Sequence, residues 1–142
     1  MRGFYLVLVV ALALTTSAFA DTAPRVNDPE KFSSDIFGNP PQIDPARMAK
    51  TIAATVGKPS LADTVEKALG VLDGKKIDIL KKVRDDQYGD ALRQIIYYSY
   101  VPDLGFIYFR FNFKLTSTGW ILANFNFKSE TEELFPKDFL VR

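Results

Sequence analysis

The sequence predicts an α+β fold in which an N-terminal helical hairpin packs on a curved antiparallel β-meander of three to four strands. Two segments with helical spacing of apolar residues come first, over residues 44–56 and 60–73. Two segments that alternate strictly, FIYFRFNFKL and WILANFNFK, come last. Alternation with a period of two over this length indicates strands with one buried face. Helices followed by a run of strands are typical of the α+β class.

The first 20 residues have the features of a secretory signal peptide. Arg2 precedes an apolar run from Phe4 to Thr15, and Ala18 and Ala20 occupy the small-residue positions before a cleavage site. A retained membrane anchor is the alternative, but the run is shorter than the roughly 20 residues of a spanning helix. We therefore expect cleavage after Ala20, a periplasmic or secreted protein, and no membrane attachment after cleavage.

The composition of the mature chain excludes several kinds of chemistry. Loss of Arg2 leaves 17 bases against 17 acids, so the balanced charge offers no general attraction to nucleic acid. The chain has no cysteine and no histidine. Sites that need these residues, including Ser-His-Asp triads and His-rich zinc sites, are therefore impossible. We expect no cofactor and no metal.

Residues 21–43 are predicted to be an extended leader or linker in front of a single domain at 44–142. The segment is rich in proline and has no sustained period. Phe32, Ile36 and Phe37 are candidates to hold it against the domain. Whether the leader is ordered stays open at this point.

The two helices have recognisable ends. Asp44 is a good N-cap in front of Pro45, which is favoured at the first helical position, and Gly57 ends the helix. Ser60 is expected to cap the second helix, which would end at Gly74. The short link between them predicts a hairpin.

The middle of the chain leaves two assignments open. Residues 77–86 fit either a strand or a short helix, and we favour a strand. Residues 91–101 are rich in β-branched and aromatic residues, which favours a strand, with a helix as the alternative. The turn at 102–105 then leads into the alternating segments.

The register of the last hairpin follows from the buried face. Pairing Leu115 with Ile121 and Phe111 with Phe125 keeps large apolar residues on one side. The loop would then be Ser117–Gly119, a three-residue loop with its glycine in the left-handed conformation.

The opposite face of the predicted sheet carries the candidate binding residues. This register places Asn112 opposite Asn124, Arg110 opposite Asn126 and Tyr108 opposite Lys128. Aromatic, amide and guanidinium groups together favour recognition of a partner, although a solvated face is the alternative. The candidate set is Tyr98, Tyr108, Arg110, Asn112, Trp120, Asn124, Asn126 and Lys128.

The chain ends in a capping-box pattern and an apolar tail. Ser129 and Glu132 predict a single helical turn over residues 129–133, and Phe139 and Leu140 are expected to pack. Acidic pairs such as Asp85 and Asp86 are weak evidence for catalysis, because adjacent acids on a turn are usually solvated.

Two helices followed by a meander that ends in GW…NFNFKS resemble the nuclear-transport-factor-2-like and cystatin-like α+β group, and the Gly119-Trp120 hairpin resembles that of small bacterial periplasmic domains. The resemblance covers residues 44–136 and implies a sheet curled around a helix that often dimerises through the sheet. The long first helix of that group is here split in two. Its members range from isomerases to binding modules, so no activity carries over.

The sequence therefore leads to two functional hypotheses. The first is a non-enzymatic binding module that binds a protein partner or itself through the open sheet face. The alternative is a pocket-bearing ligand carrier, or an isomerase-like or hydrolase-like enzyme of the same fold group. That alternative requires a deep cavity between helices and sheet.

Overall fold

The structure, a computed structural model, describes residues 25–129. The predicted signal peptide and the apolar tail lie outside these residues, as does the turn expected at 129–133 apart from its first residue. The described helices are α1 Pro29–Asp35, α2 Pro45–Val56 and α3 Ala62–Leu69, with the 3₁₀ turns η1 Pro59–Leu61 and η2 Gly70–Leu72. The strands are β1 Ile79–Tyr88, β2 Leu92–Val101, β3 Gly105–Thr116 and β4 Gly119–Lys128.

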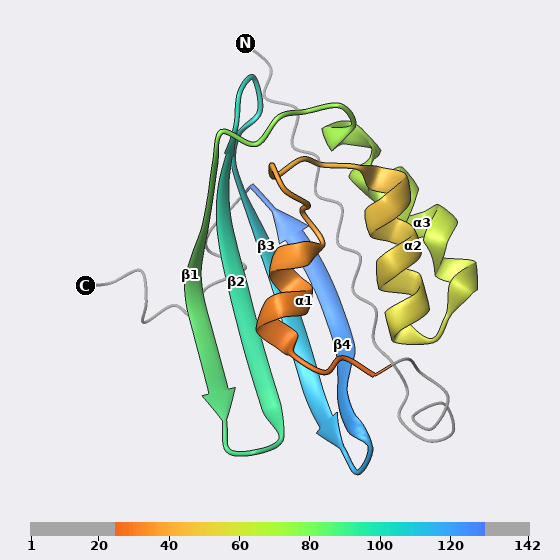
Figure 1. The fold of residues 1–142 in the computed structure, drawn as a ribbon. Helices are drawn as coiled ribbons and strands as arrows, with labels where there is room; N and C mark the ends of the chain where they lie inside the picture. Colours follow the sequence, from red (N-terminus) through yellow and green to blue (C-terminus); the bar gives the residue numbers. More distant parts are fainter. Residues whose placement is uncertain (1–24, 130–142) are drawn as a thin grey trace.

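The four strands form one antiparallel sheet in the order β1-β2-β3-β4, and the α+β class is confirmed. All three helices lie on the same face of this sheet (Figure 1). Helix α1 contacts β2, while α2 contacts β4 and α3. Both ambiguous middle segments are strands, so the strand assignments for residues 77–86 and 91–101 are confirmed apart from their ends.

Part of the predicted extended leader is a helix, so that expectation is wrong for residues 29–35. The Asp28 side chain accepts hydrogen bonds from the backbone N–H groups of Glu30 and Lys31, at 2.9 and 3.1 Å, and Pro29 occupies the first turn. The same Asp-Pro signal begins α2, where Asp44 accepts from the N–H of Arg47 at 3.0 Å. The leader has the cap of a helix but is too short to show a helical period.

The predicted end of α2 is confirmed, whereas both predicted ends of α3 are wrong. Gly57 ends α2 in the left-handed conformation, at φ 74°, as expected. Ser60 does not cap α3: it lies inside the 3₁₀ turn η1, and no side chain caps the start of α3. Helix α3 ends at Leu69 and continues as η2, so it stops before Gly74.

The register of the β3–β4 hairpin agrees with the prediction far from the loop and differs from it near the loop. Phe111 pairs with Phe125 as predicted, but Thr116 pairs with Gly119, so the loop has two residues rather than three. An additional residue, Ala123, lies between the Asn112 and Phe113 pairs as a bulge. A one-residue shift moves side chains to the other face, and Leu122 therefore takes the buried place predicted for Ala123.

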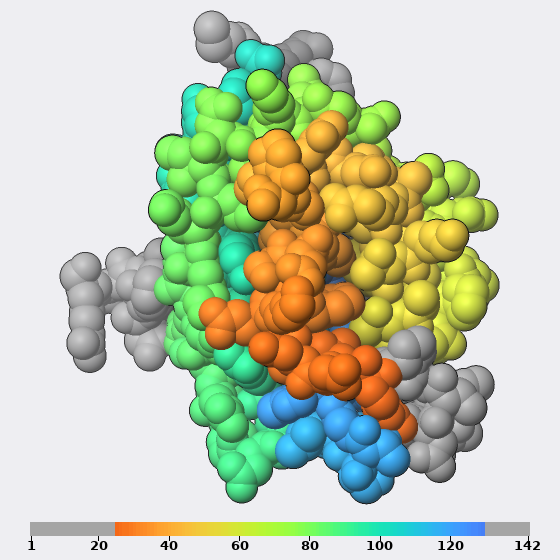
Figure 2. Space-filling model, in the orientation of Figure 1, coloured from red at the N-terminus to blue at the C-terminus, as the bar shows by residue number. Residues whose placement is uncertain are grey.

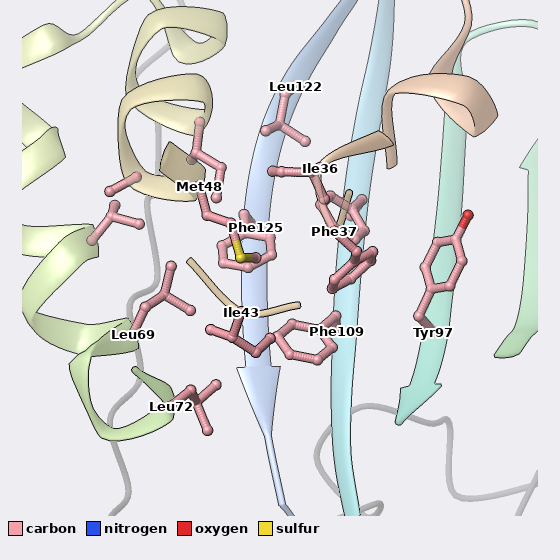
Figure 3. Packing of buried hydrophobic residues seen from close by; sticks show 14 of the residues in the cluster. Ile36, Phe37, Ile43, Met48, Leu69, Leu72, Tyr97, Phe109, Leu122 and Phe125 are labelled. Carbon is pink, nitrogen blue, oxygen red and sulfur yellow. The ribbon is translucent and has the colours of Figure 1, made fainter. Parts of the chain in front are cut away.

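The core between helices and sheet combines aromatic rings with aliphatic side chains (Figure 3). Phe37 is fully buried, and its ring centroid lies 5.0 Å from that of Phe109, 5.4 Å from Tyr97 and 6.1 Å from Phe111. In the space-filling view the atoms of residues 25–43, in orange, fill the front of the sheet up to the yellow α2–α3 region (Figure 2). The helices and the leader thus cover the centre of one face of the sheet, whereas no described helix lies on the other face.

Candidate functional site

The candidate site lies on the sheet face that no described helix covers, which we call the open face (Figure 1). The observed register brings its residues from all four strands into adjacent rows. Its described members are Ile79, Lys81, Arg84, Asp86, Tyr88, Leu92, Gln94, Ile96, Tyr98, Tyr100, Phe106, Tyr108, Arg110, Asn112, Lys114, Ile121, Asn124, Asn126 and Lys128.

Two of these rows carry the polar centre of the open face. Asn112 pairs with Asn124, and Arg110 pairs with Asn126, as the sequence predicted. The Gln94 side chain donates a 2.9 Å hydrogen bond to Oδ1 of Asn112. These pairs lie beyond the bulge, in the half of the hairpin whose register was predicted correctly.

Arg110 is a half-buried charge without an acidic partner among residues 25–129. Its Nε atom is buried and has no hydrogen-bond partner there. Burial lowers the pKa of the Arg110 guanidinium, because desolvation disfavours the charged form. Burial of a charge without compensation is costly, so this arrangement favours a ligand that supplies an anion.

The amides beside Arg110 are also incompletely bonded. The Oδ1 atoms of Asn124 and Asn126 are buried and accept no hydrogen bond from the described residues, and Asn126 is only 6 % exposed. Most buried polar groups in folded proteins are paired. A guanidinium donor and two amide acceptors therefore lie next to each other with unused hydrogen-bonding capacity.

An aromatic cluster flanks this polar centre. The rings of Tyr98 and Phe106 stack with centroids 5.3 Å apart, and those of Tyr98 and Tyr108 meet edge to face at 5.7 Å. Tyr100 lies 5.3 Å from Phe106, which is 50 % exposed. Burial, and then the nearby Tyr98, raise the pKa of Tyr108. Large rings beside a guanidinium are typical of binding hot spots.

Trp120 does not belong to this surface, so its predicted place on the open face is wrong. It pairs with Leu115 and packs against the core cluster on the helix side. The bulge at Ala123 is the cause, because it reverses the faces of the residues between the bulge and the loop. The backbone of Trp120 also pairs with Val26 of the leader, whose N–H donates to the Trp120 carbonyl at 2.8 Å.

Sequence reasoning placed Tyr98 of β2 on the open face but missed Ile96 of β2 and the contribution of β1. Arg84 and Asp86 form an ion pair, and the Tyr88 hydroxyl lies 3.4 Å from Asp86. Ile96 is fully buried at the centre of the face, with Tyr108 packed against it. The alternation of β1 and β2 was the available signal, but their assignment as strands was too uncertain to use it.

Aromatic side chains fill the centre of the helix side of the sheet. Phe109, Phe111 and Phe113 are each at most 1 % exposed, and Phe37 fills the space above them. Tyr97 is the hydroxyl-bearing ring there, and its oxygen lies 3.4 Å from that of the buried Ser33. The aromatic side chains occupy the space that a deep pocket would need.

Comparison of the chain with known proteins gives no matching family model and no matching curated protein. Residues 25–129 contain no cluster of His, Cys, Asp or Glu suited to a metal ion. In that same range no helix is long and apolar enough to cross a membrane.

Proposed function

We propose that this is an exported, non-enzymatic binding module that recognises a protein partner, or a second copy of itself, through the open face. The observation that carries this proposal is Arg110, a half-buried guanidinium with no acid beside it in the described chain. The neighbouring amides add hydrogen-bond acceptors and donors. The aromatic cluster of Tyr98, Phe106 and Tyr108 adds apolar contact area. A partner with a carboxylate next to an apolar side chain fits this combination.

The expected relation to the nuclear-transport-factor-2-like and cystatin-like group is part of this proposal. We also propose that α2 and α3 form a helical hairpin, that the sheet is curved, and that the protein dimerises through the open face. The open face supports dimerisation because its aromatic rings are partly exposed and lie on neighbouring strands.

The proposal is tested by removing the charge of Arg110 in the mature chain. We expect Arg110→Gln to weaken binding at least about tenfold, as truncation of a hot-spot arginine does. Lys50→Gln is the matched control, because Lys50 is exposed on α2 and far from the open face. Self-association is measured by analytical ultracentrifugation over a wide concentration range, and partner binding by pull-down from cell-envelope extract.

The outcomes separate cleanly. A dimer or a captured partner that is lost with Arg110→Gln and retained with Lys50→Gln supports the proposal. A protein that stays monomeric and whose captured partners are retained equally by both variants contradicts it.

A further inference from the structure

We propose that the outer edge of β1 pairs antiparallel with β1 of a second copy of this chain, so that two four-stranded sheets join into one sheet of eight strands. The interface is symmetric, because both copies contribute the same strand. It uses the edge of the sheet and not its open face. The inference therefore goes beyond the proposed function and holds whether or not the open face binds a partner.

The two edge strands of the sheet differ in what the chain places beside them. Strand β4 contacts α2, and its residue Trp120 pairs with Val26 of the leader. Strand β1 lies at the margin away from α2 and α3 (Figure 1), and none of residues 25–129 pairs with its outer edge. An edge strand presents a row of N–H and C=O groups that can hydrogen-bond another strand. Within the described chain, β1 is thus the edge left for a second copy.

Strand β1 is long and exposed for an edge strand. It has ten residues, and its apolar side chains Ile79, Val83 and Tyr88 are 43 %, 43 % and 52 % exposed. Proteins usually keep such an edge from pairing by shortening it or by placing charges on it. Strand β1 carries charges, but they are ordered: the sequence ILKKVRDDQY has its lysines in the first half and its aspartates in the second.

This order makes β1 complementary to itself in the antiparallel direction. With a two-fold axis between Val83 and Arg84, each residue faces a residue from the other half of the second copy's strand. The pairs are Ile79–Tyr88, Leu80–Gln87, Lys81–Asp86 and Lys82–Asp85. Opposite charges and apolar pairs directly across from each other stabilise antiparallel strands, whereas like charges destabilise them. Lys81 is exposed and forms no ion pair with any of residues 25–129, so the pairing supplies its partner.

The bulge in β1 makes this register possible. Residues that pair must share a face of the sheet. Lys81 and Asp86 both lie on the open face, and Lys82 and Asp85 both lie on the helix side. The register shift between Lys82 and Arg84 produces this match, because residues 81 and 86 of a strand without a bulge would lie on opposite faces. A pairing moved by one residue would set Lys81 against Asp85, which lies on the other face.

The joined sheet has both open faces on the same side, because the residues of each pair share a face. The two copies of Arg110 lie on β3, the third strand from the shared edge. Five strand spacings of about 4.8 Å separate the two β3 strands, which is about 24 Å. A partner with two acidic segments then engages both sites, and its second contact benefits from the high effective concentration of the first.

Exchange of two charges tests the register. Lys81→Asp and Asp86→Lys are each prepared in the mature chain, and dimerisation is measured by analytical ultracentrifugation. We expect each variant alone to dimerise at least about tenfold more weakly than the unaltered chain, because like charges then face each other. We expect a one-to-one mixture to regain the unaltered affinity to within about threefold, because the mixed dimer has opposite charges at both positions. Lys50→Asp, on the exposed side of α2, is the control and should not weaken the dimer.

The outcomes separate this interface from the open face. An unaltered chain that stays monomeric up to about 1 mM would overturn the edge pairing, as would a mixture that dimerises no better than its components. A dimer that is lost with Arg110→Gln but kept with Lys81→Asp overturns the edge pairing and supports dimerisation through the open face. A dimer that keeps its affinity with Arg110→Gln and shows the recovery on mixing supports the edge pairing, whatever the open face binds.

A cysteine cross-link tests the position of the axis without changing any charge, because Asp86→Lys also removes the ion pair with Arg84. The chain has no cysteine, so Val83→Cys introduces a single thiol beside the axis. The two thiols then lie diagonally across adjacent strands, within the Cα separation of about 4.4–6.8 Å that a disulfide spans. Gln87→Cys is the matched control, because it is exposed on the same strand but about 23 Å along the strand from its copy in this register. We expect mild oxidation to link Val83→Cys at least about tenfold faster than Gln87→Cys. Equal rates would overturn the register.

Discussion

At the scale of single residues, Phe37 shows how a leader segment becomes part of the core. It lies outside the regular elements, two residues after α1, and yet its ring contacts Tyr97, Phe109 and Phe111 at the centre of the helix side. Its neighbour Ile36 is 4 % exposed. The sequence identified both as possible anchors, and the structure confirms that they are buried.

We expect Phe37→Ala to lower the free energy of unfolding by about 3–5 kcal/mol, because it removes a fully buried ring and leaves a cavity among rings that cannot close. Phe106→Ala removes the same atoms from a side chain that is 50 % exposed, and it should cost less than about 1.5 kcal/mol. Urea unfolding of the two variants measures the difference. Equal losses of unfolding free energy in the two variants would show that the Phe37 ring contributes no more to stability than the half-exposed Phe106 ring.

At the scale of elements, α1 is stabilised and held in position by contacts with the sheet. A helix of seven residues is far too short to be stable alone. Glu30 of α1 forms an ion pair with Lys82 of β1 and lies 3.4 Å from Arg93 of β2. Arg93 in turn binds Asp85 of β1 through two hydrogen bonds of 2.8 Å. These four side chains link the helix to two strands.

The Asp85 carboxylate should give stability a defined pH dependence. Its hydrogen bonds from Arg93, and then those from Lys82, lower the pKa of Asp85 despite the opposing effect of burial. Its contribution is therefore complete above the unfolded-state pKa, about 3.9, and is lost as pH falls through the lower folded-state pKa.

We expect Asp85→Asn to lower the free energy of unfolding by about 1–2 kcal/mol at neutral pH, with the deficit shrinking as pH falls below about 4. Glu66→Gln, on the exposed side of α3, is the control for loss of an acid. Thermal unfolding from pH 2 to 7 measures both variants. A deficit that stays constant down to the lowest pH would contradict the role given to the ion pair.

At the scale of the whole molecule, no disulfide can stabilise the fold, because the chain has no cysteine, and the packed core has to supply most of the stability. Its core is a continuous cluster that includes the leader, α2, α3 and three strands. The open face adds a second, smaller cluster around Ile96 and Tyr108.

The absence of histidine predicts a flat stability profile around neutral pH. Histidine is the side chain that ordinarily titrates between pH 5 and 8. The pKa of Asp85 is shifted downward by its hydrogen bonds from Arg93, away from this range. We expect the free energy of unfolding to vary by less than about 0.5 kcal/mol between pH 5.5 and 7.5. The free energy of unfolding is measured by urea unfolding at several pH values. A clear dependence on pH over this range would reveal a titrating group whose pKa is strongly shifted.

The sequence by itself determined the α+β class, the strand character of the last two segments and one half of their register. Strict alternation fixes a strand, since a period of two has no helical equivalent, and it fixes the buried face wherever no bulge interrupts the strand. Asp44, Pro45 and Gly57 likewise set the ends of α2 through local backbone chemistry. The same alternation assigned Arg110, Asn112, Asn124 and Asn126 to one face correctly.

Only the tertiary structure decided the features that depend on distant contacts. The bulge at Ala123 moved Trp120 to the helix side, where the leader pairs with it at Val26. Helix α1 forms because the sheet supplies its partners, and β1 and β2 complete the open face through long-range pairing. Local sequence encodes caps, turns and alternation, whereas register shifts and the docking of short segments depend on the free energy of the assembled core.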